Sequence, residues 1–88
     1  MLAEEQTIEK LRQKIDKIDG EIVQELNNRA KIVAVIGELK NKAGLPVLDS
    51  QREHEIFTKL SLHNSGPLDD RSLKDIYEKI LVCMKSFE

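Results

Sequence analysis

The sequence predicts an all-α fold with three helices, of which the first is by far the longest. Apolar side chains recur every three or four residues, and no stretch alternates with the period of two that a β-strand requires. No proline precedes Pro46, and only two glycines precede Gly44. Turn-forming residues then cluster at 43–48 and at 63–67, and these two clusters divide the pattern into three helices.

The first helix is predicted from about Thr7, whose hydroxyl is a candidate N-cap, to about Lys42. From Glu5 to Lys42 it would be about 57 Å long, whereas a compact domain of 88 residues has a diameter of about 31 Å. We therefore expect a second chain to cover its apolar face in a two-fold dimer, with the long helices side by side. That face, called the stripe below, consists of Ile8, Leu11, Ile15, Ile18, Ile22, Leu26, Arg29, Val33, Ile36 and Lys40.

The other two predicted helices are shorter and begin at acidic or hydroxyl capping residues. The second is expected from an N-cap at Asp49 or Ser50 to about Leu62. The third begins after a cap at Asp69 or Asp70. Its expected core face consists of Leu73, Ile76, Tyr77, Ile80, Leu81, Met84 and Phe87.

The composition argues against a nucleic acid or a membrane as a partner. The net charge is −2 with acidic and basic residues mixed, and only 3% of residues are aromatic, so neither a nucleic acid nor an anionic membrane is an expected partner. There is no signal peptide and no apolar run long enough to span a bilayer, which predicts a cytoplasmic protein. The single cysteine, Cys83, excludes an intramolecular disulfide and is expected to pack in the third helix. Residues 1–88 are predicted to form a single domain, either complete or cut from a longer polypeptide.

Two cations interrupt the stripe and are the first candidates for chemistry. Arg29 and Lys40 are eleven residues apart, so on one helix they point the same way within about 20°. Either their aliphatic stems cover core surface while their charges reach solvent, or they bind a dianion in a water-poor pocket between helices. Arg12 borders the same stripe. It is either a solvated arginine or, in an antiparallel pair of chains, a third cation that approaches from the partner.

The start of the second helix carries a second cluster of charges. Asp49 has a sufficient explanation as an N-cap, and Arg52 and Glu53 are either solvated or part of a site that binds a hydroxyl and an acid group. His54 and His63 have no second ligand at metal spacing, so no metal site is expected.

Four motifs occur in order along the chain, and together they carry a family resemblance. They are Leu11-Arg12-x-x-Ile15-Asp16-x-x-Asp19, Leu26-x-x-Arg29, Ile36-Gly37-x-x-Lys40 and Gly44-x-Pro46-Val47-x-Asp49-x-x-Arg52-Glu53. Over essentially its whole length the chain resembles the all-helical (AroQ-type) chorismate mutases. The resemblance implies three helices per chain intertwined in a homodimer, with no cofactor and no covalent intermediate.

The resemblance also implies a reaction and a set of binding residues. Chorismate would rearrange to prephenate, an intramolecular Claisen rearrangement in phenylalanine and tyrosine biosynthesis. Arg12 of the partner chain and Arg29 would each bind a substrate carboxylate. Lys40 would contact a carboxylate and the ether oxygen, where negative charge develops in the transition state.

The remaining implied roles belong to residues of all three helices. Asp49 and Glu53 would hold the ring hydroxyl, and Arg52 would support the electrostatics. Ile36 and Leu81 would form an apolar wall.

Two positions of the last helix depart from the commonest family pattern. Met84 stands where a small hydroxyl residue is usual, and Glu88 stands where a glutamine donates to the ether oxygen. A glutamate can donate only when it is protonated. We therefore expect activity to rise as the pH falls below neutral, and a Glu88→Gln variant to have a flatter pH profile.

Two other functions were weighed against the mutase. An isochorismate pyruvate lyase of the same fold would share the cationic pocket, but the Asp49-x-x-Arg52-Glu53 pattern favours the mutase. A non-catalytic helical dimerisation or regulatory module would explain the long helix, but it gives no reason for Arg29 and Lys40 on the stripe.

Overall fold

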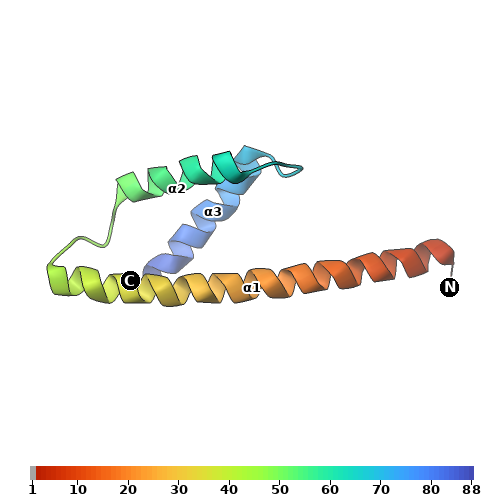
Figure 1. Ribbon diagram of the computed structural model, residues 1–88, viewed down its shortest axis with the longest axis horizontal. Helices are drawn as coiled ribbons and strands as arrows, with labels where there is room; N and C mark the ends of the chain where they lie inside the picture. Colours follow the sequence, from red (N-terminus) through yellow and green to blue (C-terminus); the bar gives the residue numbers. More distant parts are fainter. Residues whose placement is uncertain (1) are drawn as a thin grey trace. The chain divides into compact units, whose positions relative to one another are not determined.

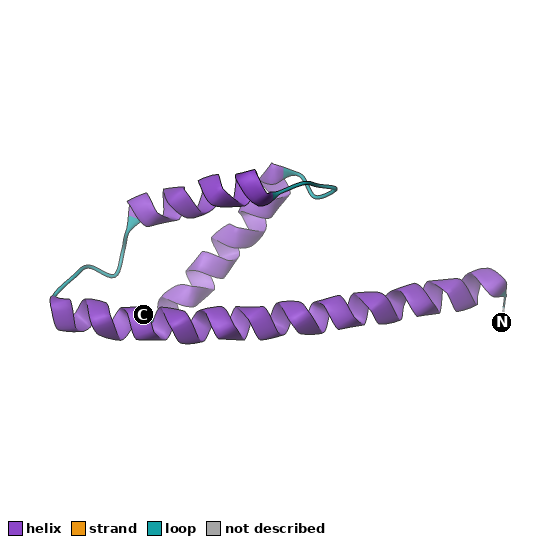
Figure 2. Ribbon diagram, in the orientation of Figure 1, coloured by secondary structure: helices purple, strands orange, loops and turns teal. Residues whose placement is uncertain are grey.

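The computed structural model describes residues 2–88 and confirms an all-α chain with three helices (Figure 1). The helices are α1 (Ala3–Ala43), α2 (Ser50–His63) and α3 (Asp70–Met84), followed by the short 3-10 helix η1 (Lys85–Phe87). Over residues 2–88 there is no β-strand (Figure 2), and none of the helices in that range is long and apolar enough to cross a bilayer.

The chain divides into two compact parts, and each is described by itself. The first ends at Ile32, and the second is Val33–Glu88. They are called the N-terminal part and the C-terminal part below.

The start of α1 differs from the prediction. The helix begins at Ala3 rather than near Thr7, whose hydroxyl instead donates to the Ala3 carbonyl at 3.0 Å within the first turns. The Glu5 carboxylate in the first turn accepts from the Leu2 N–H, just before the helix, at 3.2 Å. The prediction was wrong because alanine, glutamate and glutamine are strong helix formers, and acidic side chains in a first turn interact favourably with the helix dipole.

The end of α1 is fixed by a glycine in a left-handed conformation. Gly44 has φ 68°, a value that side chains disfavour. Its N–H donates to the Asn41 carbonyl at 3.3 Å, and the Leu45 N–H donates to the Lys40 carbonyl at 2.9 Å. This pair of bonds is the Schellman arrangement, and it ends the helix at Ala43, one residue beyond the predicted end.

The N-termini of α2 and α3 carry the caps that the sequence indicated. Of the alternatives, Asp49 caps α2 by accepting from the Arg52 N–H at 3.0 Å. Asp69 caps α3 by accepting from the Ser72 N–H at 2.6 Å. Hydrogen bonds from the Ser72 backbone, and secondarily from its side chain, hold the pKa of the Asp69 carboxyl below its ordinary value of 3.8.

The turn between α2 and α3 is organised by one asparagine. The Asn64 side-chain amide donates to the Leu68 carbonyl at 2.8 Å and to the Asp70 carboxylate at 2.7 Å. Its side-chain oxygen accepts from the Gly66 N–H at 3.1 Å. The Ser61 hydroxyl donates to the other oxygen of the same Asp70 carboxylate at 2.9 Å. These four bonds tie the end of α2 to the start of α3.

The core face of α3 is shorter than predicted. Met84 is buried, but Ile76 and Phe87 are about half exposed, and Cys83 is exposed rather than packed. Ile76 and Cys83 lie roughly 85° and 105° around the helix from the centre of the buried face, at 100° per residue. Phe87 leaves the face because the chain tightens into η1 after Met84.

The C-terminal part has a small apolar core between its helices. Val33 and Met84 are buried, and α2 packs against α3. Further half-buried apolar residues complete this core: Ile56, Phe57, Leu60, Leu73, Tyr77, Ile80 and Leu81.

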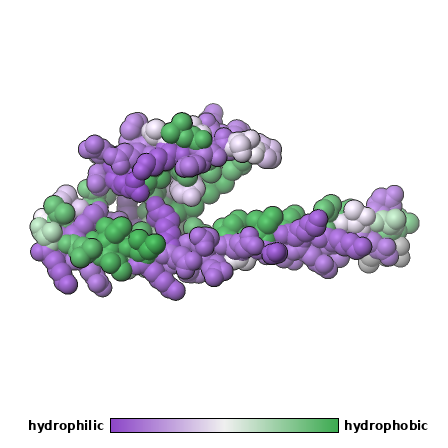
Figure 3. Space-filling model, in the orientation of Figure 1, coloured by the Kyte–Doolittle hydropathy of each residue, from purple (hydrophilic) through white to green (hydrophobic). Residues whose placement is uncertain are grey.

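The N-terminal part is a single helical segment whose apolar residues remain accessible. The first five residues of the stripe, from Ile8 to Ile22, are each 47–55% exposed. Figure 3 shows apolar side chains gathered along one side of this segment. Only towards its end does burial increase: Leu26 and Arg29 are half-buried and Ala30 is buried.

Candidate active site

Lys40 is held at both ends by neighbouring backbone. Its ammonium donates to the Val47 carbonyl at 3.1 Å, and its own carbonyl accepts from the Leu45 N–H at 2.9 Å. The side chain is half-buried. The hydrogen bond directs the cation towards the loop between α1 and α2.

The end of the chain lies directly against α1 near Lys40. Gly37 is buried, and a Cβ added to it would lie 2.8 Å from the Glu88 Cα and 2.9 Å from the Glu88 carbonyl oxygen. Because Gly37 and Lys40 are three residues apart on one helix, they occupy adjacent turns. The structure thus brings the Glu88 backbone to the same end of α1 as Lys40.

A hollow of about 320 Å³ opens at this place. Gly37 contributes to it from α1, Val47 from the loop, and Phe87 and Glu88 from the end of the chain. Val47 is also the residue whose carbonyl accepts from the Lys40 ammonium. The rest of its lining is Ala34, Glu38, Asn41 and Leu45, so the charged members of the hollow are two glutamates. A cation for an anionic ligand at this end of α1 has to come from Lys40, which lies outside the lining.

The charged side chains at the start of α2 have hydrogen-bond or ion-pair partners within the chain. Asp49 serves as the N-cap. Arg52 forms an exposed ion pair with Glu55 at 3.6 Å, and Glu53 forms one with Lys85 of η1 at 3.8 Å. Exposed pairs of this type contribute little to stability, so Arg52 and Glu53 can exchange these partners for a ligand at small cost.

The apolar candidates differ in exposure. Ile36 is 43% exposed, Leu81 is half-buried and Met84 is 7% exposed. A thioether has no hydrogen to donate, so Met84 supplies packing and no donated hydrogen bond.

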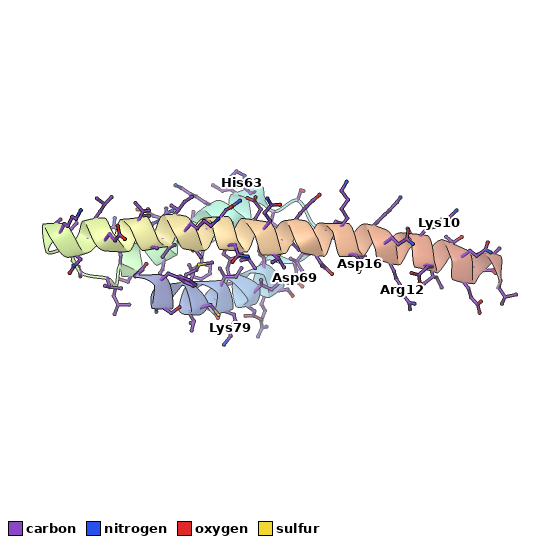
Figure 4. The ribbon with its side chains drawn as sticks, turned by 90° about the horizontal axis from the view of Figure 1, so that it is seen from below. Lys10, Arg12, Asp16, His63, Asp69 and Lys79 are labelled. Atoms are coloured by element: carbon purple, nitrogen blue, oxygen red, sulfur yellow. The ribbon has the colours of Figure 1, made fainter. Side chains whose placement is uncertain are left out.

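The two candidate arginines lie on the N-terminal part. Arg12 is exposed, and its side chain extends away from the helix (Figure 4). Arg29 is half-buried. The distances between Gly37 and Glu88 and between Lys40 and Val47 join residues of the C-terminal part, and neither arginine takes part in them.

The histidines take no part in a metal site within the described chain. His54 and His63 are exposed. Over residues 2–88, no group of three or more His, Cys, Asp or Glu side chains is placed to hold a metal ion.

Three features of the site were not anticipated from the sequence. They are the Val47 carbonyl as the partner of Lys40, Lys85 as the partner of Glu53, and the contact of Gly37 with Glu88. Only the last had a visible signal. A glycine in the interior of a helix is unfavourable by about 1 kcal/mol relative to alanine, so it often marks a close approach of another backbone.

Comparison with known proteins identifies the family of this chain. The family model described as chorismate mutase type II matches residues 11–88. The chain belongs to the chorismate mutase type II family. The resemblance stated from the four sequence motifs is thereby confirmed.

Relatives and solved structures of chorismate mutases agree with this assignment. The chain is 41% identical over 85 residues to a bifunctional chorismate mutase/prephenate dehydratase of Aquifex aeolicus, covering 92% of this chain and 24% of that protein. A chorismate mutase structure from Thermus thermophilus matches with a TM-score of 0.86 and 32% identity, covering 89% of this chain and 98% of that one. A Helicobacter pylori chorismate mutase in complex with prephenate matches with a TM-score of 0.85 and 28% identity, covering 93% of this chain and 89% of that one.

The chain is short beside its bifunctional relatives. It spans about a quarter of the length of the curated bifunctional proteins that it matches, 24% of the Aquifex aeolicus protein and 22% of that from Neisseria gonorrhoeae.

Proposed function

We propose that this chain catalyses the rearrangement of chorismate to prephenate. The observation that carries the proposal is the Lys40 ammonium, which donates to the Val47 carbonyl at the end of α1 where Gly37 meets Glu88, within a chain of the chorismate mutase type II family. The Helicobacter pylori relative, which was solved with prephenate, supports a ligand of this class.

The reaction suits a site that works by electrostatics and orientation. Chorismate carries two carboxylates and must adopt a compact conformation before its C–O bond breaks and its C–C bond forms. Fixed cations select that conformation, which lowers the barrier by orientation. A cation at the ether oxygen stabilises the transition state more than the ground state, because negative charge grows there as the C–O bond breaks.

In this proposal each cation binds a different group of the substrate. Arg29 and Arg12 of a second chain each bind a carboxylate. Lys40 contacts a carboxylate and the ether oxygen, and Glu88 in its protonated form donates to the same oxygen.

The remaining proposed contacts position the ring. Asp49 and Glu53 accept from the ring hydroxyl, with Arg52 beside them. Ile36, Leu81 and Met84 supply apolar surface.

We also propose an intertwined homodimer, because the N-terminal part does not bury its apolar residues within the chain. Five stripe residues between Ile8 and Ile22 remain about half exposed, and a contiguous apolar surface of this kind marks an interface. A two-fold partner would cover the stripe with an identical stripe. The same pairing would bring the exposed Arg12 to a site in the C-terminal part of the other chain.

Residues 1–88 form one chorismate mutase domain in this proposal, and the cytoplasmic location predicted from the sequence stays a prediction. A substrate assay tests the activity. Chorismate loss and salicylate release from isochorismate are followed separately with the purified protein. We expect chorismate loss only. Salicylate release would identify the lyase instead, and turnover of neither substrate would leave a dimerisation module.

Replacing Lys40 tests the site. A Lys40→Ala variant is expected to lose about a hundredfold or more in kcat/KM, the effect of removing one preorganised transition-state contact. Lys42→Ala is the matched control, since Lys42 is an exposed lysine of the same helical turn. Full activity of Lys40→Ala would show that the catalytic site lies elsewhere.

A further inference from the structure

α1 contains two glycines, and their surroundings differ sharply. A Cβ added at Gly20 would meet nothing within 4 Å. A Cβ added at Gly37 would lie 2.8 Å from the Glu88 Cα, 2.9 Å from its carbonyl oxygen and 3.2 Å from its carbonyl carbon. Real Cβ atoms do not approach other atoms to under 3.0 Å, so a side chain at Gly37 would force the two segments apart.

The atoms that meet Gly37 belong to backbone, which cannot turn aside as a flexible side chain can. The segment before them is also held: Met84 is buried, and the Glu88 N–H donates to the Lys85 carbonyl at 3.2 Å. Within η1, the Ser86 hydroxyl donates to the Cys83 carbonyl at 2.9 Å. Residues 85–88 thus form a hydrogen-bonded turn that packs against α1, and the close contact is possible because Gly37 has no side chain.

We propose that Gly37 is a positioning residue that sets how closely the Glu88 backbone, and with it the Glu88 carboxyl, approaches the end of α1 that carries Lys40. This inference rests on the proposed chorismate mutase function. Gly37 contacts no substrate in it. It acts through Glu88, because only a glycine lets the Glu88 backbone lie this close to α1 at the hollow that Gly37, Val47 and Glu88 line.

The proposal predicts a specific kinetic signature for Gly37→Ala. The added methyl group displaces the Glu88 backbone, and a displacement of about 1 Å at a reacting centre lowers a rate by about a hundredfold. We therefore expect kcat to fall between about tenfold and a hundredfold. KM should change less than about threefold, because the cations that bind the carboxylates stay in place.

Gly20→Ala is the matched control. It makes the same chemical change in the same helix, about 160° around the axis from the centre of the stripe. It removes the same helix-propensity penalty, so it should melt at a slightly higher temperature and keep wild-type kcat.

A double-mutant cycle separates positioning from general damage. In a Glu88→Ala background, Gly37→Ala should lower kcat by less than about twofold further, because the group through which it acts is gone. An equal fold loss in both backgrounds, or no loss in either, would overturn the proposal.

Hydrogen exchange of the backbone amides at 85–88 provides a readout that is independent of activity. Exchange there should be faster in Gly37→Ala than in Gly20→Ala, and equal exchange in both would refute the seating of the chain end on Gly37. If the wild-type chain does not turn over chorismate, the proposed function fails, and this measurement still decides the placement.

A second variant is available should Gly37→Ala melt below the assay temperature. Glu88→Asp leaves the backbone contact in place but withdraws the carboxyl by one methylene group. We expect a fall in kcat of about tenfold, and full activity in this variant would overturn the proposal.

Discussion

The two parts of the chain place their apolar and charged residues in different ways. The N-terminal part is one helical segment with five stripe residues about half exposed and two arginines. The C-terminal part has a buried core, two capped helices, a bonded turn and an anchored lysine. Of the three buried apolar residues described, Val33 and Met84 belong to the C-terminal part and Ala30 to the N-terminal part.

This contrast assigns different physical tasks to the two parts. Core side chains of the C-terminal part have partners within the chain, so their positions are set when one chain folds, whereas other apolar residues there, such as Ile36, Leu39 and Leu62, stay exposed. Stripe residues in the N-terminal part gain free energy only by contact with another surface, at about 25 cal/mol for each Å² of apolar area covered. We therefore expect the N-terminal part to be stabilised by contact with a second chain, and the C-terminal part to set the positions of the site residues.

The largest effect is expected from a charge on the stripe. Ile15→Asp places an aspartate on the apolar face of both chains of a two-fold pair, and an unpaired buried charge is strongly unfavourable. We expect a monomer by sedimentation equilibrium and a loss of mutase activity greater than about a thousandfold, because every site would lose Arg12 as well as its walls.

Gln13→Asp is the control for this variant. It adds the same charge to the same helix about 180° from the centre of the stripe, and it should remain dimeric and active. A dimeric, active Ile15→Asp variant would show that the stripe is not the interface.

Mixing two inactive variants sharpens the comparison further. If Arg12 acts across the interface, a heterodimer of Arg12→Ala and Lys40→Ala chains contains one intact site and one that lacks both groups. Random exchange of subunits makes half of the dimers mixed, so activity should recover to about a quarter of the wild-type value. If Arg12→Ala is inactive, no recovery after verified subunit exchange would place Arg12 in the site of its own chain.

A smaller effect is expected in the turn of the C-terminal part. Asn64→Ala removes three side-chain hydrogen bonds, to Leu68, Asp70 and Gly66. We expect the free energy of unfolding to fall by about 1–3 kcal/mol, measured by urea denaturation at fixed protein concentration. Ser65→Ala, an exposed neighbour in the same turn, should change it by less than about 0.5 kcal/mol.

The smallest effect is a pH dependence at the start of α3. The pKa of Asp69 is lowered from 3.8 by its hydrogen bonds with Ser72, so its ionised form stabilises the folded state. That contribution is complete above the unfolded pKa and is lost as the pH falls from 3.8 through the lower folded value. Asp69→Asn keeps a capping side chain without the charge.

The melting temperatures of wild type and Asp69→Asn should therefore differ above pH 3.8 and converge below it. Asp75→Asn, an exposed change within the same helix, corrects for net charge. An Asp69→Asn difference that is constant with pH would contradict this linkage.

Local patterns were sufficient to predict most of the fold. The capping residue Asp49 and the breakers Gly44 and Pro46 predicted the first interhelical boundary to within one residue, because caps and glycine ends act over a few bonds. The predicted helix start near Thr7 was wrong, because a hydroxyl inside a helix can donate to the carbonyl four residues back as readily as it can cap a helix. Phe87 was misplaced because the change to a 3-10 turn after Met84 has no periodic signature.

The candidate site was predictable in kind but not in geometry. Arg29 and Lys40 stood out because cations on an apolar stripe need a partner. The partner that Lys40 has in the structure, the Val47 carbonyl, was invisible because backbone acceptors have no sequence signal. The assignment of Arg12 to a neighbouring chain came from the resemblance and from helix length, and it stays a prediction.

The hydrogen bond between the Lys40 ammonium and the Val47 carbonyl has a thermodynamic consequence for any ligand that binds to this ammonium. A free lysine side chain loses up to about 2 kcal/mol of rotamer entropy when it is immobilised. Here part of that loss occurs on folding, because the ammonium already donates to the Val47 carbonyl. A ligand that takes over the ammonium exchanges one hydrogen-bond acceptor for another, so its affinity is reduced less by ordering of the side chain than it would be at a mobile surface lysine.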